Sequence, residues 1–189
     1  MDSRYVHLAI GNINIDVTVY IEKYPSPGEA IIATDLDIRP GGAASNYSVA
    51  VAQYGHRVYL IASASNHDYA KIVLNELKNK GVIVDNVKIV DSPPGIVIII
   101  VERNGERTML KYPGANRELS VDDIPLELRK KAHVIHMASI DSMLALEISN
   151  RFRGSGALIT YDPGAHVEQM YKNLKLLENI DVLFLNEKE

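Results

Sequence analysis

A carboxylate and two amides follow the first apolar segment of the chain, where Gly11-Asn12-Ile13-Asn14-Ile15-Asp16 comes directly after Tyr5–Ile10. The apolar run is typical of a buried strand, and ligands in open α/β sheets bind beyond the carboxyl ends of such strands. Asn14 and Asp16 would therefore stand at a cleft, where they can take two or three hydrogen bonds from the hydroxyls of a polyol. The competing interpretation is a turn, in which both side chains only contact nearby backbone.

A pair of glycines opens the next candidate site, in the segment Gly41-Gly42-Ala43-Ala44-Ser45-Asn46. Because glycine has no side chain, a ligand can approach this backbone closely, and the predicted helix that follows presents free N–H groups there. Asn46 lies one turn into that helix, where its amide can both donate and accept. A tight turn before a helix would have the same composition, so the pattern alone leaves both interpretations open.

Three more polar loops are expected at the same edge of the sheet. Tyr112-Pro113-Gly114-Ala115-Asn116 follows a predicted hairpin, Tyr161-Asp162-Pro163-Gly164 ends a predicted core strand, and Asn186-Glu187-Lys188-Glu189 follows another. The carboxyl ends of parallel strands meet at one edge, so these loops would lie beside the two segments above. Turns alone do not require so many polar loops at one edge. The sequence therefore predicts a binding site there.

The elements that must hold these loops alternate between β-like and helix-like segments. Glycines mark several boundaries, as at Gly81, a normal residue just beyond a helix end. Strands are predicted at Tyr5–Ile10, Asp16–Ile21, Ala30–Arg39, Val58–Ser63, Ile96–Val101, Arg107–Tyr112, Val134–Met137, Leu158–Tyr161 and Val182–Leu185. Helices are predicted at Ala43–Tyr54, Asp68–Lys80, Ser120–Lys131, Ser142–Phe152 and Val167–Leu177.

The second half of the chain alternates strand and helix, which indicates an α/β fold with a parallel sheet covered on both faces. Asp16–Ile21, Ala30–Arg39 and the hairpin around Asn104-Gly105 do not fit that alternation, and we expect them to form a small antiparallel sheet beside the core. The run Ile96–Val101 cannot bury both its faces against one core, which predicts a homodimer through this sheet. Burial of the hairpin between the small sheet and the core is the alternative.

Composition excludes several classes of protein. The 189 residues include 20 Lys and Arg against 24 Asp and Glu, which gives a net charge of −4. The sequence has no basic patch that would attract a phosphate backbone, so we expect no nucleic acid as a partner. The absence of cysteine excludes disulfides, thiolate-bound zinc and iron–sulfur clusters. No apolar run is long enough for a membrane span and no signal peptide is evident at the N-terminus, so we expect no membrane partner and a cytoplasmic location.

Motifs of other enzyme classes are also missing from the sequence. It has neither a P-loop nor the G-x-G-x-x-G fingerprint, which disfavours a dinucleotide-binding oxidoreductase, and it has no G-x-S-x-G elbow of an α/β hydrolase. His133 and His136 are three apart on a predicted strand, so they face opposite sides and cannot easily share a metal. The polar loops therefore remain the strongest candidates for function.

Together and in this order, the motifs resemble the ribokinase-like family of carbohydrate kinases, of the phosphofructokinase-B type. The resemblance covers essentially the whole chain and is closest to the archaeal branch that includes sugar and nucleoside kinases. It rests on Gly11-x-x-Asn14-x-Asp16, Pro27-Gly28-Glu29, Gly41-Gly42-x-x-x-Asn46, Gly55, Gly81-Val82, Gly114-Ala115-Asn116 and Asn186-x-x-Glu189.

The resemblance implies a three-layer αβα core with a mainly parallel sheet and a small β-sheet lid. The core, the N-terminal part of a kinase domain, would comprise residues 1–11, 41–95 and 113–189, and the lid would comprise residues 12–40 and 96–112. Lids of this family cover the sugar and often join two subunits, which agrees with the homodimer expected from the apolar strands.

The implied activity is transfer of the γ-phosphate of ATP to a hydroxyl of a sugar or nucleoside, with Mg²⁺. Asn186 would lie near the nucleotide phosphates, and Glu189 would organise the magnesium ion through water. Ser139 stands where many relatives have an acidic residue, and Asp162–His166 lacks the basic residue of some sugar-acid kinases, which disfavours acidic acceptors. Seven residues would hold the acceptor: Asn14, Asp16, Gly41, Gly42, Asn46, Asn116 and Ser139.

The catalytic aspartate of this family lies in a Gly-Ala-Gly-Asp segment that the sequence does not contain. Because that segment would take the hydroxyl proton and supply backbone donors to the transferred group, no catalytic residue is assigned within the chain. The chain is expected to hold the acceptor without catalysing the transfer. The alternative is a non-catalytic polyol-binding or regulatory module of the same fold.

Overall fold

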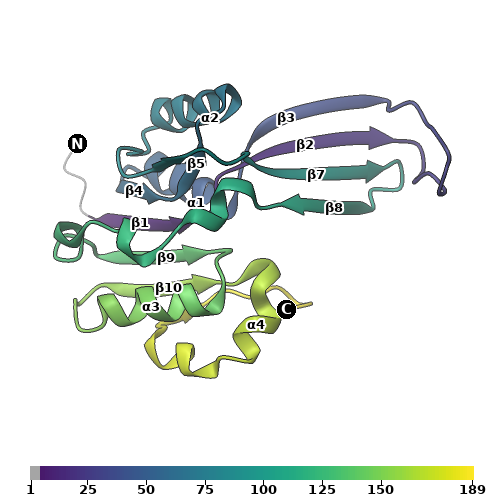
Figure 1. The fold of residues 1–189 in the computed structure, drawn as a ribbon. Coiled ribbons are helices and arrows are strands. Elements are labelled where there is room, and N and C mark those ends of the chain that lie inside the picture. The colour runs from purple at the N-terminus through teal and green to yellow at the C-terminus, as the bar shows by residue number, and fades with distance from the viewer. Residues whose placement is uncertain (1–4) are drawn as a thin grey trace.

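The computed structural model describes residues 5–189, which form an α/β core and a long β-sheet that projects from one side of it (Figure 1). The first four residues of the range 1–11, which the sequence assigns to the core, lie outside the described residues. The core sheet is parallel throughout, with the strand order β11-β10-β9-β1-β4. Its strands are β1 Val6–Gly11, β4 Arg57–Ile61, β9 Val134–Ala138, β10 Leu158–Asp162 and β11 Val182–Leu183.

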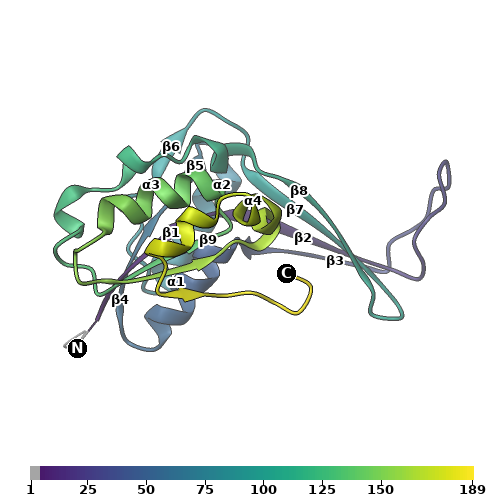
Figure 2. The same ribbon diagram turned by 90° about the horizontal axis from the view of Figure 1, so that it is seen from below.

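Helices cover both faces of this sheet. They are α1 Ala43–Gln53, α2 Asp68–Asn79, α3 Ser142–Phe152 and α4 Val167–Tyr171. Leu8 and Ile10 of β1 pack in one hydrophobic core with residues of α3 and α4, whereas Ala9 packs in another with residues of α1 and α2. Figure 2 shows α1 and α3 on opposite sides of the sheet, so the three-layer αβα fold expected from the sequence is confirmed. No helix in residues 5–189 has the length and apolar character that crossing a membrane requires.

The projecting sheet, called the lid below, has four strands in the order β3-β2-β7-β8. They are β2 Asn14–Ile21, β3 Asp35–Gly41, β7 Gly95–Glu102 and β8 Arg107–Tyr112. The sequence predicts an antiparallel sheet, but this is wrong for the two central strands, β2 and β7, which are parallel. Both strands leave the core in the same direction, and β3 and β8 return from their far ends (Figure 1).

The register divides the side chains of the lid between two faces, because successive residues of a strand point to opposite sides. The inner face borders the core and includes Asn14, Asp16, Thr18, Arg39, Val97, Ile99, Met109 and Lys111. The outer face is almost entirely aliphatic and includes Ile15, Val17, Val19, Leu36, Ile38, Ile96, Ile98, Ile100 and Leu110.

The predicted helix Ser120–Lys131 is wrong. The segment holds two short 3₁₀ turns, Val121–Asp123 and Leu126–Leu128. Pro125 stands between them and cannot donate a backbone hydrogen bond, so a continuous helix does not form. The capping signal was still informative, since the backbone N–H of Ser120 donates to the Asp123 carboxylate at 2.8 Å.

Three other elements also differ from the prediction. The predicted helix Val167–Leu177 stops as α4 and resumes as a 3₁₀ turn at Leu174–Asn179. The predicted strand Ala30–Arg39 begins only at Asp35, as β3. A two-stranded sheet of β5 (Ser63–Ser65) and β6 (Lys88–Val90) was not predicted as such; β6 is too short for periodicity to reveal it.

Candidate functional site

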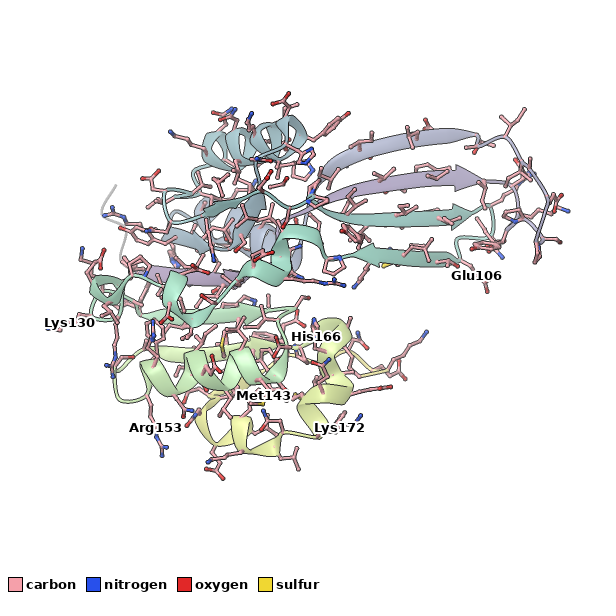
Figure 3. The ribbon with its side chains drawn as sticks, viewed as in Figure 1. Glu106, Lys130, Met143, Arg153, His166 and Lys172 are labelled. Carbon is pink, nitrogen blue, oxygen red and sulfur yellow. The ribbon has the colours of Figure 1, made fainter. Side chains whose placement is uncertain are left out.

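A cavity of about 400 Å³ lies where the lid meets the carboxyl ends of the core strands, a size common for small-molecule sites. Figure 3 shows His166, one of its lining residues, beneath the base of the lid. Six of the seven residues expected to hold an acceptor line this cavity: Asn14, Asp16, Gly42, Asn46, Asn116 and Ser139. Gly41 is not part of the lining but packs against the Asp16 carboxyl group.

Asp16 places a carboxylate on the inner face of the lid. Its Oδ1 is buried and has no hydrogen-bond partner within the described part of the chain. Burial raises the pKa of Asp16, and the positive charge of Lys111 opposes part of that rise. A Cβ on Gly41 would overlap the Asp16 carboxyl group, so the glycine gives this side chain its room. The arrangement leaves an acceptor oxygen that a ligand hydroxyl can satisfy.

Asn14 is held in place by Asn116 from the loop after the lid. The backbone N–H of Ile13 donates to Oδ1 of Asn116 at 2.9 Å, and Nδ2 of Asn116 donates to Oδ1 of Asn14 at 2.8 Å. A Cβ on Gly95 would overlap this amide pair. Because Oδ1 of Asn14 is already bonded, its Nδ2 remains to donate into the cavity. Asn116 therefore orients the side chain of Asn14.

Gly42 forms the backbone wall of the cavity at the start of α1. Its φ is 100°, in the left-handed region, and a Cβ there would overlap the carbonyl of Asn12. No side chain caps this helix start. The hydroxyl of Ser45 donates back to the Gly42 carbonyl at 2.9 Å, which fixes the turn from below. At Gly42 the backbone is therefore open to the cavity, with no side chain in between.

Ser139 links three of the loops that end core strands. Its φ is 55°, which is unusual for a residue other than glycine. Its backbone N–H donates to the carbonyl of Asp162 at 2.8 Å, and its carbonyl accepts from Nδ2 of Asn12 at 3.0 Å. A Cβ on Gly164 would lie 2.7 Å from the Ser139 hydroxyl, so the next loop packs closely against it. The floor of the cavity is thus one connected unit.

Over residues 7–189 the sequence matches the pfkB family carbohydrate kinases. The chain belongs to this family. This membership confirms the resemblance drawn from the motifs, and six of the residues that the motifs assign to an acceptor line one cavity of this pfkB family chain.

Individual relatives agree with this assignment. The chain is 27% identical to the ATP-dependent ribose-1-phosphate kinase of Halopiger xanaduensis, over 96% of this chain and 62% of that protein. It is 23% identical to the nucleoside kinase of Methanothermobacter thermautotrophicus, over 96% and 60%. The ribokinase structure from Thermotoga maritima matches with a TM-score of 0.86 and 26% identity, over 98% of this chain and 60% of that one. The chain thus spans about three fifths of the length of these pfkB relatives.

Asn186 and Glu189 lie outside the cavity lining of this pfkB chain. Oδ1 of Asn186 accepts from the backbone N–H of Glu189 at 3.1 Å, and a Glu189 carboxylate oxygen accepts from the backbone N–H of Asn186 at 3.1 Å. This reciprocal pair has the form of a capping box. Burial raises the pKa of Asp162, and the nearby charge of Glu189 adds to that rise. The pair therefore lies outside the cavity lining, and the charge of Glu189 acts on Asp162 at the end of β10.

The cavity also contains residues that the motifs do not assign to it. Lys111 is the one with a charge, and strand alternation in the hairpin places it on the same face as Met109, two positions earlier. That signal was present in the sequence, but its meaning depends on which face of the lid meets the core. The further lining residues are Asn12, Ala43, Ile96, Val97, Ile99, Met109, Lys111, Tyr112, Pro113, Ala165 and His166.

Proposed function

We propose that the chain is the acceptor-binding part of an ATP-dependent kinase that phosphorylates a hydroxyl of a sugar or nucleoside. The observation that carries the proposal is the buried, unpartnered Oδ1 of Asp16 in a cavity that three asparagine side chains, Asn14, Asn46 and Asn116, also line. A buried carboxylate oxygen without a partner is costly in free energy, and a ligand hydroxyl that donates to it removes that cost. Neutral polyols are the ligands that offer several such hydroxyls together.

The acceptor would bind through complementary donors and acceptors on the two sides of the cavity. One hydroxyl donates to Asp16, and a neighbouring hydroxyl accepts from Nδ2 of Asn14. Gly42 lets the ring approach the start of α1, where Asn46 can add a further hydrogen bond. Val97 and Ile99 of the lid cover the opposite side and restrict water, which strengthens these hydrogen bonds.

ATP and Mg²⁺ would approach from the side of Asn186 and Glu189. The residues suit a magnesium ion held mainly by water and phosphate, since Glu189 offers a carboxylate close to that of Asp162. In residues 5–189, no cluster of three or more His, Asp or Glu side chains could hold a metal by itself. When bound, the ion would neutralise charge on the transferred phosphoryl group. Glu189 would orient its water, and Asn186 would lie beside the nucleotide phosphates.

The chain by itself would bind the acceptor and leave it unreacted. The Gly-Ala-Gly-Asp segment that supplies the catalytic aspartate in this family has no counterpart in the sequence. Asn14 and Asn46 cannot take a proton from the acceptor hydroxyl, because amides are not bases at neutral pH. Asp16 is a carboxylate and could take a proton, but it is assigned to hold a hydroxyl other than the one that is phosphorylated. Transfer would then require a segment of that kind.

Assembly would use the outer face of the lid, with residues 12–40 and 96–112 as lid and the remainder as core. Val17, Ile98, Ile38 and Leu110 lie in one row across the four strands. Three of them are well exposed, at 37% for Ile98, 43% for Ile38 and 54% for Leu110. An aliphatic patch of this extent favours a partner surface, and a second copy of the same face matches it in shape and chemistry.

Calorimetric titration of the chain with ribose and with adenosine, combined with an assay for ADP release from MgATP, tests the proposal. We expect binding of at least one acceptor and no ADP release. Binding of neither would contradict the acceptor site, and acceptor-dependent ADP release would contradict the inactivity of the chain. A longer gene product that contains Gly-Ala-Gly-Asp but binds acceptor without turnover would instead support the non-catalytic polyol-binding module.

A further inference from the structure

A lysine reaches the cavity from the strand farthest from Asp16. Lys111 of β8 pairs with Val97 of β7, and Val97 pairs with Asp16 of β2. The three side chains therefore share one row on the inner face of the lid, and all three line the cavity. Adjacent strands are about 4.8 Å apart, so the Cα atoms of Asp16 and Lys111 are separated by about 10 Å.

Lys111 has no ion pair within residues 5–189, and unlike Arg107, the other unpaired cation of the lid there, it lines the cavity. Arg39 pairs with Asp37, and Arg103 pairs with Glu22, whereas no carboxylate lies within 4.0 Å of the Lys111 ammonium. Its charge still acts on two carboxyl groups, of which Asp16 lines the cavity. Burial raises the pKa of Asp16 and of Asp162, and Lys111 opposes part of the rise at each. The Lys111 ammonium thus forms an ion pair with neither carboxylate.

A neutral sugar gives such an ammonium nothing to neutralise. A lysine ammonium is a compact positive charge that binds a phosphate group well, and it would also bind a carboxylate. The motifs disfavour acidic acceptors because the loop Asp162–His166 lacks a basic residue, but here the cation enters the same cavity from the lid.

We propose that Lys111 recognises a phosphate group on the acceptor while Asp16 holds its hydroxyls, so that the preferred acceptors are sugar phosphates rather than free sugars or nucleosides. This inference rests on the proposed kinase function and specifies its substrate class. Asp16 selects for a polyol, and Lys111 selects for an anionic substituent on it. His166, on the core side of the cavity, lies where it can add a donor to the same group.

Calorimetry on the chain with ribose, ribose 1-phosphate, ribose 5-phosphate, ribonate and adenosine tests this class. At low salt we expect one ribose phosphate to bind at least about tenfold more tightly than ribose, ribonate and adenosine. Lys111→Met should reduce that preference to below about threefold and leave the affinity for ribose nearly unchanged. Arg107→Met removes a cation from the same strand that does not line the cavity, and should keep the full preference. High salt should weaken only the phosphate esters.

Other outcomes overturn the inference in distinguishable ways. If Lys111→Met weakens ribose and ribose phosphate equally, the lysine acts only through Asp16. If it weakens ATP and leaves the preference intact, the lysine serves the donor. If ribonate binds as tightly as ribose phosphate, a carboxylate is enough and the phosphate assignment is wrong. Ribose binding without any preference for its phosphates sinks this inference alone, whereas binding of no acceptor also removes the proposed function.

Discussion

The side-chain amides of Asn14 and Asn116 are joined by a 2.8 Å hydrogen bond, although 102 positions separate them in the sequence. One residue begins the first strand of the lid, and the other stands in the loop that leaves its last strand. The same Asn116 also accepts from the backbone N–H of Ile13. The entry and the exit of the lid are therefore fastened together at the cavity wall.

Asn116→Ala should lower both stability and acceptor affinity. It removes the partner of the Ile13 N–H and the donor to Asn14, so we expect the free energy of unfolding to fall by about 1–2 kcal/mol. Asn116→Asp separates the two effects. The carboxylate of the variant still accepts from the Ile13 N–H but has no hydrogen to donate to Asn14. The side-chain amide of Asn14 would then flip, so that its NH₂ group donates to this carboxylate and no longer points into the cavity. Urea unfolding and acceptor calorimetry should show Asn116→Asp with near-normal stability and weakened binding; equal effects of both variants would contradict this role.

Asp16→Asn should weaken acceptor binding by about 1.5–3 kcal/mol, the usual range for hydrogen bonds to a charged group. Without a ligand, the same substitution should leave the melting temperature unchanged or higher, because it removes a buried charge with an unpartnered oxygen. Calorimetry and thermal unfolding measure the two effects. Asp35→Asn, an exposed change in β3, is the matched control. Unchanged acceptor affinity in Asp16→Asn would remove this residue from the site.

Two buried histidines, His7 and His136, contact the side chain of Tyr47 in α1. His7 is hydrogen-bonded to the Tyr47 hydroxyl at 2.7 Å and to His56 at 3.0 Å, and the His136 ring stacks on Tyr47 with centroids 3.9 Å apart. Burial, followed by the charges of His56 and His133, lowers the pKa of His7 to about 4. Burial, followed by the charge of His7, lowers the pKa of His136 to about 4.

The stability of the protein should therefore fall in mild acid. Both histidines stay neutral in the folded state but bind protons below about pH 6.5 when unfolded, so acid favours unfolding. We expect the free energy of unfolding to drop between pH 6.5 and about 4, by up to about 1.4 kcal/mol per pH unit for each histidine. Urea unfolding across this range measures it. His136→Gln should flatten the profile and the half-buried His166→Gln should not; identical profiles for parent and His136→Gln would exclude this cause.

The lid surface can be tested by the double substitution Ile98→Asp and Ile100→Asp. Both residues are on the outer face, and two carboxylates there would be desolvated in a dimer. Light scattering should show a dimer for the parent at micromolar concentration and a monomer for the double variant. Ile32→Asp is the control, since this side chain is 92% exposed in the loop before β3. A monomeric parent contradicts the dimer, and a dimeric double variant places the interface elsewhere.

Local signals made much of the fold predictable. Strand β1, helix α1 and the lid hairpin were correct because their ends carry Gly11, Gly41-Gly42 and Asn104-Gly105, which act within a few residues. The parallel pairing of β2 with β7 was not predictable in that way. It joins segments about 80 residues apart, and depends on the direction in which both leave the core. Pro125 is visible in the sequence as a helix breaker, but the helix Ser120–Lys131 was predicted from the capping signal at Ser120.

The candidate site divides along the same line. Asn14, Asp16 and Gly42 were found because motif and strand end coincide, and the structure brings them to one cavity. Lys111 was missed because its place follows from the register of three strands, Asp16 to Val97 to Lys111. The division of work between Asn14 and Asn116 likewise depends on which amide atom meets Ile13, and spacing in the sequence carries no such information.

The alternation along β2 limits how the lid can change its length. Asn14 and Asp16 point into the cavity while Ile15 and Val17 point outward, so this part of β2 has a polar face and an aliphatic face. Deletion or insertion of a single residue within β2 would exchange the two, exposing the carboxylate and turning an isoleucine toward the cavity. Length variation in the strand itself must therefore occur in steps of two, whereas residues 22–34, between β2 and β3, are free of this parity rule.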